Sequence, residues 1–211
     1  MNHFSIETIQ GWDRFYRANF MNCLTGFKPA ALISTLHETN IPNLALFSNL
    51  LHIGADPAHI GLLCRPRAST PHTYENILRD GLFNLNLVTE SQMQAAHQSS
   101  ARYPAEISEF SATGLDVHFY PGIKVPFVGG APVQVALQLV EALPLSVNDT
   151  TLFIGAVTHV YIENGLLAPD GFIALEQLNT ICTLGLDGYY KPRPIGRLSY
   201  AKPGKTPELL G

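Results

Sequence analysis

Two long apolar runs on either side of a short polar turn constrain the fold of this chain more than any other feature. The runs are residues 133–143 and 151–162, and the turn lies at 146–150. Side chains alternate along the second run, with Ile154 on one side and Phe153 on the other, as in a β-strand. Two such strands joined by a turn form an antiparallel hairpin.

Shorter elements precede this hairpin. Strand-like runs are found at residues 30–36, 43–50, 60–65 and 82–89, whereas residues 104–130 show little regular pattern. A helix is expected from Pro71 to Arg79, with Thr70 as its N-cap, and a second one from the capping box at 89–92 to Tyr103. The pattern predicts a mainly β fold with inserted helices, in which the antiparallel strands form a closed or half-closed barrel.

No repeat or linker divides the chain. Residues 1–27 are predicted to form an N-terminal arm, and residues 28–211 a single domain with an exposed C-terminal tail. A helix is expected at 6–20, and its aromatic face should pack on the barrel or on a partner subunit. That face carries Trp12, Phe15, Tyr16 and Phe20.

The amino-acid composition limits the kinds of partner that this chain can bind. Hydrophobic residues make up 46% of the chain and charged residues 14%, and the formal net charge is −4. Sparse charge favours a large buried contact, most simply a homodimer, over a monomer with a polar, uncharged surface. The acidic balance argues against nucleic acid. The most apolar region, 131–162, is interrupted by polar residues, so no membrane span is expected. Three cysteines in no paired spacing indicate a reducing, cytoplasmic location.

Several kinds of active site have no signature here. The eight histidines show no compact metal-ligand spacing, so no metal is expected. There is no Gly-x-Ser-x-Gly elbow, no P-loop and no dinucleotide-binding glycine motif.

Arginines and hydroxyls gather where the strand at 60–65 leads into a helix. Arg65 and Arg67 are followed by Ser69, Thr70 and Thr73. A helix start offers free N–H groups and a positive dipole end, which suits a phosphate group. The residues alone are also compatible with a capped surface helix and solvated arginines.

The order of these segments resembles the flavin reductase-like family, the FMN-binding split barrels. The similarity extends from about Asn19 to Lys202. It includes residues 28–35, 43–48, 154–157 and 188–190, together with His97 and the Ser108-Glu109-Phe110 segment.

The resemblance implies an antiparallel split β-barrel that binds FMN. It implies that residues of the strand at 43–48 line the flavin ring and ribityl chain, and that residues around the helix start hold the phosphate. The implied cofactor-binding residues are Asn43, Leu44, Ala45, Phe47, Ser48, Arg65, Thr70, Thr73 and Asn76. No catalytic side chain is nominated, because the flavin itself would carry the hydride or electrons.

The resemblance further implies an oxidoreductase, a flavin reductase that uses NADH or NADPH and serves an oxygenase or another redox partner protein. Many two-component flavin reductases carry Gly-Asp-His on a late strand. This chain has Gly155-Ala156-Val157-Thr158-His159 there, so no nicotinamide contact is implied for His159. Two alternatives remain open: a flavoredoxin-like FMN electron carrier and a non-redox barrel that binds another small ligand.

Overall fold

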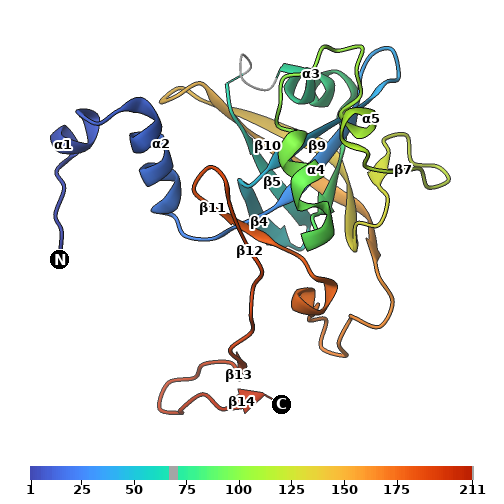
Figure 1. The fold of residues 1–211 in the computed structure, drawn as a ribbon. Helices are drawn as coiled ribbons and strands as arrows, with labels where there is room; N and C mark the ends of the chain where they lie inside the picture. The colour runs from blue at the N-terminus through green and yellow to red at the C-terminus, as the bar shows by residue number, and fades with distance from the viewer. Residues whose placement is uncertain (67–70, 211) are drawn as a thin grey trace.

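The protein is built on one seven-stranded antiparallel sheet, seen in a computed structural model that describes residues 1–66 and 71–210 (Figure 1). Its strand order is β3-β2-β6-β9-β10-β5-β4. The bounds are β2 Ala31–Leu36, β3 Pro42–Phe47, β4 Leu50–Ala55, β5 Ala58–Cys64, β6 Leu82–Leu87, β9 Val133–Leu145 and β10 Thr150–Ile162. The mainly β, antiparallel fold predicted from the sequence is therefore confirmed.

Smaller elements surround this sheet. The strands β1 Lys28–Pro29, β11 Cys182–Leu184 and β12 Gly188–Tyr190 form a three-stranded sheet. Two further pairs join β7 Val117–His118 with β8 Phe127–Val128, and β13 Arg197–Leu198 with β14 Leu209–Leu210. The helices are α1 Ile6–Gln10, α2 Arg14–Cys23, α3 Pro71–Asp80, α4 Met93–Gln98 and α5 Glu109–Thr113, with 3₁₀ turns η1 Glu90–Gln92 and η2 Leu175–Leu178.

The long hairpin of β9 and β10 lies at the centre of the sheet. Each strand has 13 residues, and their register shifts twice, between Ile154 and Gly155 and between Val157 and His159. Such irregularities bend a strand and increase its twist, which lets the sheet curl around its core. The enclosed core contains buried side chains from six of the seven strands and from α3, including Ile33, Phe83, Phe153 and Ile77.

The strand β2 is buried along its entire length because both of its faces are covered. Ala31 and Ile33 face the enclosed core, whereas Leu32 belongs to a second apolar cluster on the outer face. That second cluster includes Leu44 of β3 and Phe110 of α5. The edge strand β3 is thus held between the barrel core on one side and the helices α4 and α5 on the other.

The N-terminal arm has its own aromatic cluster. Trp12 contacts Phe4, Tyr16 and Phe20 edge-to-face, with ring centroids 4.9–5.2 Å apart. Figure 1 shows α1 and α2 projecting from the barrel, and neither helix contains a buried residue. The prediction of a single helix at 6–20 was wrong. Asp13 accepts hydrogen bonds from the Phe15 and Tyr16 amides and starts a second helix.

Three other expectations need correction. The apolar run at 43–50 is divided, because β3 ends at Phe47 and β4 begins at Leu50. The helix expected to reach Tyr103 ends at Gln98. The segment 104–130, expected to hold little regular structure, contains α5 and the pair of β7 and β8. No helix in the described part of the chain has the length and apolar character needed to cross a membrane.

Candidate functional site

A cavity of about 650 Å³ opens beside the edge strand β3. Its wall combines β3, the end of β5, the start of α3, the segment 99–103 and the hairpin of β11 and β12. The lining thus includes both the start of α3 and this hairpin, which lie apart in Figure 1. Its volume lies within the range of about 300–1,000 Å³ typical of small-molecule and cofactor sites.

The outer edge of β3 supplies backbone polar groups to this cavity. In an antiparallel pair, alternate residues direct both N–H and C=O away from the partner strand. The Leu44 N–H points away from β2, since it donates to Glu109 Oε2 at 2.9 Å. By the same alternation the N–H and C=O groups of Leu46 also point outward, and Leu46 lines the cavity.

A buried polar network fixes the start of α3 against β2 and β3. The Thr35 hydroxyl accepts hydrogen bonds from Asn43 Nδ2 at 3.0 Å and from Asn76 Nδ2 at 2.9 Å. Asn43 Nδ2 also donates to the Thr73 hydroxyl at 3.1 Å. Arg79 in turn donates to Asn76 Oδ1 at 3.0 Å. Thr73 and Asn43 line the cavity, so this network sets the geometry of one of its ends.

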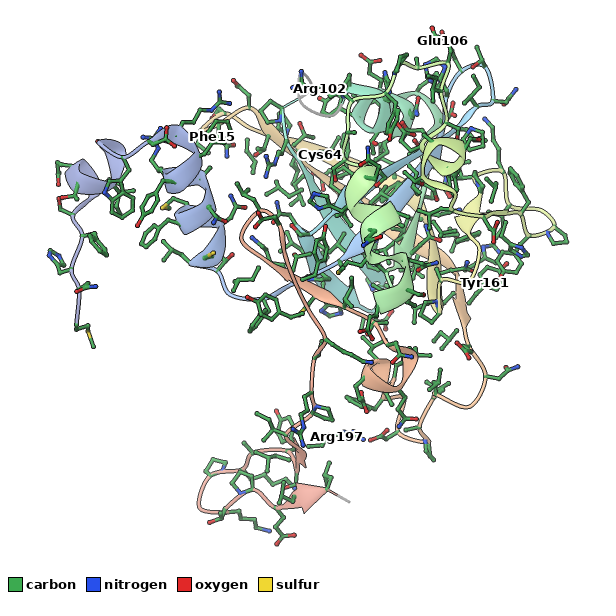
Figure 2. The ribbon with its side chains drawn as sticks, viewed as in Figure 1. Phe15, Cys64, Arg102, Glu106, Tyr161 and Arg197 are labelled. Atoms are coloured by element: carbon green, nitrogen blue, oxygen red, sulfur yellow. The ribbon has the colours of Figure 1, made fainter. Side chains whose placement is uncertain are left out.

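The cavity is cationic, although the chain as a whole is acidic. Its described lining includes three arginines, Arg14, Arg65 and Arg102, and one carboxyl group, that of Glu109. Arg102 lies on the same side of the molecule as α3 (Figure 2). All three arginines have exposed side chains. A cleft lined mainly by one sign of charge attracts a ligand of the opposite sign, here an anion.

Glu109 is the one acidic group among the described lining residues, and only 6% of it is exposed. Burial raises the pKa of its carboxyl group above the ordinary 4.5, while the Leu44 N–H and the charge of His72 oppose part of that rise. The carboxyl group therefore retains its proton to a higher pH than an exposed glutamate does.

This burial should make stability depend on pH in a defined way. Above pH 4.5 and until the raised pKa is passed, the folded chain binds more protons than the unfolded one, so the free energy of unfolding falls as pH rises. Glu109→Gln keeps an acceptor for Leu44 but cannot ionise. In urea unfolding of the flavin-free chain, we expect this variant to gain stability relative to the parent between pH 4.5 and pH 8.

The matched control is Glu106→Gln, because Glu106 is exposed in the loop before α5 (Figure 2). Its difference from the parent should stay nearly constant over the same pH range. An equal pH dependence of the parent and Glu109→Gln would contradict the raised pKa.

Residues 27–177 match the family model described as the flavin reductase like domain. The chain belongs to this family. A crystal structure of a candidate flavin reductase with a split barrel domain, from Shewanella frigidimarina, is 39% identical, with a TM-score of 0.92 over 95% of this chain and 100% of that one. The antiparallel barrel is thus the split barrel of the flavin reductase-like family.

Two more distant structures share the fold alone. Nitrilotriacetate monooxygenase component B from Bacillus cereus is 22% identical, with a TM-score of 0.82 over 94% of this chain and 98% of its own. Flavoredoxin of Desulfovibrio vulgaris is 19% identical, with a TM-score of 0.69 over 85% of this chain and 92% of its own.

In this flavin reductase-like chain, most of the residues predicted to bind a cofactor meet at one cavity. Seven of the nine line it, namely Asn43, Leu44, Ala45, Phe47, Ser48, Arg65 and Thr73. Asn76 is not among the lining residues: it is 1% exposed, and it is linked to the cavity-lining Asn43 only through the Thr35 hydroxyl that both donate to. Thr70, with Arg67 and Ser69, lies outside the described residues. Direct cofactor contacts remain predictions for all nine.

Sequence reasoning did not assign Arg14, Arg102 or Glu109 to this site, although all three line the cavity. For Tyr189, which also lines the cavity, the sequence left two interpretations open: contact with a flavin or substrate, and half-buried packing. Glu109 and Tyr189 belong to segments that resemble the family, and this resemblance was the sequence signal that could have assigned them to the site. Arg14 comes from the arm, and Arg102 from a loop with no motif. No group of three or more potential metal ligands is found in the parts of the chain that the structure describes.

Proposed function

We propose that this flavin reductase-like protein binds FMN in the cavity beside β3 and acts as an oxidoreductase. The observation that carries the proposal is that one cavity is lined by Arg65 at the end of β5, by the start of α3, and by the uncovered backbone edge of a strand. The arginine and the helix start suit a phosphate monoester, and the strand edge suits a flat ring with polar edges. Family membership supports the same ligand class.

The phosphate end would lie at the start of α3. Pro71, His72 and Thr73 form the first turn of this ten-residue helix and line the cavity, as does Arg65 at the end of β5. The N–H groups of such a turn have no partner within the helix, and the helix dipole adds positive charge. One anionic group fits there, and no dinucleotide-binding glycine motif provides for a second phosphate, which favours FMN over FAD.

The ring would lie along β3. Outward N–H and C=O groups at Leu46 match the alternating donors and acceptors of a flavin pyrimidine, while Ala45 and Phe47 offer apolar contact. Backbone groups are fixed by the sheet, so they can hold the ring and polarise it without any titratable side chain. This arrangement fits the cofactor.

The proposed reaction is hydride transfer from NADH or NADPH to the bound flavin. An electron-carrier role, like that of flavoredoxin, remains the second candidate because of one observation. This chain has Gly155-Ala156-Val157-Thr158-His159 where many flavin reductases carry Gly-Asp-His, and His159 is exposed and is not among the cavity-lining residues. A non-redox barrel is the third candidate.

Two measurements separate these candidates. Cofactor released from the purified or reconstituted protein should be identified as FMN by chromatography, at one per subunit; FAD, or no flavin, would exclude the proposed ligand. Anaerobic titration with NADH and NADPH should then bleach the flavin absorbance. Bleaching by dithionite but by neither nicotinamide would exclude the reductase and leave the electron-carrier role as the remaining redox function.

We further propose that the protein is a homodimer that supplies an oxygenase or another redox partner. Large apolar side chains remain exposed on two separate surfaces, the arm and one side of the sheet. Examples are Phe15, 74% exposed, and Phe27 near the arm, and Leu51, Ile53 and Val140 on β4 and β9. Exposed apolar side chains of this size are available for an interface between proteins.

Light scattering of a dilute solution should therefore give about twice the 23.1 kDa of a single chain. The double change Leu51→Glu and Ile53→Glu, on the exposed side of β4, should shift the mass toward the monomer. A matched change at an exposed polar position, Gln94→Glu on α4, should leave it unchanged. A monomeric parent that still binds FMN tightly would contradict the dimer.

A further inference from the structure

The C-terminal segment differs in charge from the rest of the chain. Residues 191–210, here called the basic tail, contain five basic side chains and one carboxylate, whereas the whole chain has 13 basic and 17 acidic residues. The basic residues are Lys191, Arg193, Arg197, Lys202 and Lys205, and the carboxylate is Glu208. More than a third of the basic residues of an acidic chain therefore lie in this one segment.

The basic tail forms a hairpin that has no core of its own. Its strands β13 and β14 pair over two residues each, and no residue from 191 to 210 is buried. Figure 1 shows this hairpin set apart from the barrel. An isolated two-stranded hairpin is only marginally stable in water. The tail therefore needs another surface to pack against, and it exposes large apolar side chains for this purpose: Ile195, Leu198, Tyr200, Leu209 and Leu210.

Contacts at the root of the basic tail leave the charges near its turn without partners. Arg197 forms an ion pair with Asp170, and its guanidinium group lies 4.0 Å from the centroid of the Phe172 ring (Arg197 is labelled in Figure 2). By contrast, no ion pair within residues 1–66 and 71–210 involves Lys202 or Lys205. The charges of these two lysines are thus available to another molecule.

One half of the main sheet has the opposite charge. Residues 50–64 and 133–163 form β4, β5, β9 and β10 with the turns that join them, and they contain no lysine or arginine. They do contain four carboxylates, those of Asp56, Glu141, Asp149 and Glu163. A cation that approaches this half of the sheet therefore meets only negative side chains of these strands and turns.

The outward side of these four strands is also apolar. The register places Leu51, Gly61, Ile154 and Glu141 in one row across β4, β5, β10 and β9. The row faces outward, because the neighbouring residues on the strands, such as Phe153, belong to the enclosed core. A second row on the same side consists of Leu63, Leu152 and Leu143. These two rows are called the outer sheet face below.

We propose, on the basis of the homodimer proposed above, that the basic tail of one chain docks on the outer sheet face of a second copy. The unpaired lysines Lys202 and Lys205 meet the carboxylates of that half of the sheet, and the exposed apolar side chains of both surfaces are removed from water. Two-fold symmetry makes each copy give one tail and receive one. The complementary surface belongs to the same sequence, which selects a second copy over a different protein.

Reversal of the two tail charges tests the docking. The dimer dissociation constant of the full chain is measured at low salt by sedimentation equilibrium over a dilution series. Lys202→Glu combined with Lys205→Glu should raise this constant about tenfold or more, because an attraction becomes a repulsion at two equivalent sites. Lys202→Arg combined with Lys205→Arg keeps both charges and should behave like the parent. Both lysines are exposed, so all variants should fold.

A charge exchange then tests which surface receives the tail. Adding Glu141→Lys to the reversed tail should restore most of the lost affinity, to within about threefold of the parent. The matched control adds Glu106→Lys instead. Glu106 is exposed in the loop before α5, so this change gives the same net charge at a position outside the outer sheet face. It should restore nothing.

The outcomes separate this inference from the function on which it rests. A dimeric parent that is insensitive to the reversed tail, the absence of recovery with Glu141→Lys, or equal recovery with Glu106→Lys would each overturn the docking and leave the homodimer in place. A monomeric parent would refute the homodimer and the docking together. The flavin content of the same samples is an independent result: a dimer without FMN would refute only the proposed ligand.

Amide hydrogen exchange gives a second, local measurement. The Ser199 N–H donates to the Glu208 carbonyl group at 2.8 Å within the hairpin. In the parent chain, this amide should exchange at least about tenfold more slowly well above the dimer dissociation constant than well below it, because docking stabilises the hairpin. Equal exchange at both concentrations would show that dimerisation does not cover the tail, and the proposal would be wrong.

Discussion

Arg65→Ala should weaken FMN binding by about tenfold to a hundredfold while changing riboflavin affinity little. A hydrogen bond to a charged group contributes roughly 1.5–3 kcal/mol, which corresponds to that range of dissociation constants. Riboflavin lacks the phosphate and therefore serves as the matched ligand. Arg65 is exposed at the end of β5, so its removal leaves the core intact. Both dissociation constants can be measured by quenching of flavin fluorescence.

The control variant is Arg193→Ala, which removes the same charge from an exposed arginine outside the cavity lining. It should leave both affinities unchanged. Equal losses for FMN and riboflavin in Arg65→Ala would assign this arginine a structural role. Unchanged FMN affinity would place the phosphate elsewhere in the cavity, where Arg102 and Arg14 are the other arginines among the described lining residues.

Thr73 should behave differently from Arg65 because its hydroxyl has two tasks. It lines the cavity, and it also accepts a hydrogen bond from buried Asn43. Thr73→Ala would therefore weaken FMN binding and also disturb the polar network, so that riboflavin affinity falls as well. Thr73→Ser keeps the hydroxyl and should preserve both affinities.

Thr35→Val should destabilise the fold strongly. The substitution nearly preserves the shape of a fully buried side chain but leaves Asn43 and Asn76 without their shared acceptor. An unsatisfied buried polar group costs roughly 1–3 kcal/mol, so the free energy of unfolding should fall by about 2–4 kcal/mol. Urea unfolding of the flavin-free protein measures this directly. FMN affinity should fall too, because Asn43 and the start of α3 lose their alignment.

Thr35→Ser is the matched control, since it retains the hydroxyl and removes one methyl group. It should lose about 1 kcal/mol or less, in line with a single buried methyl group. Similar destabilisation by valine and serine would attribute the effect to packing and not to the network.

Local patterning was sufficient to predict much of the sheet, because side-chain alternation and turn residues are short-range signals. The hairpin expected at 133–143 and 151–162 is present as β9 and β10, and α3 begins at Pro71 as predicted. The division between β3 and β4 was missed because the apolar run resumes at Leu50, although Ser48 and Asn49 are residue types that favour turns. The break in the arm was missed because the aromatic face of Trp12, Phe15, Tyr16 and Phe20 continues across Asp13.

The site was harder to predict because its determinants come from distant segments. Asn43, Asn76, Asn84 and Asn86 are polar residues that sequence alone would place at a surface, yet all four are buried and hydrogen-bonded. Their partners, such as Thr35 and the Val125 carbonyl group, are many positions away. The pairing of His97 with Tyr189, 92 residues apart, likewise exists only in the folded chain.

The edge position of β3 also bears on solubility. Two of its outward polar groups are already covered, since Ser108 donates to the Pro42 carbonyl and Glu109 accepts from Leu44. The groups at Leu46 are left for a ligand. An uncovered strand edge can pair with a strand of another chain. A flavin bound at Leu46 would occupy the groups of β3 that remain free and would prevent such pairing. Loss of the cofactor would then promote self-association of the chain. The supply of cofactor during synthesis would therefore determine how much protein is obtained without aggregation.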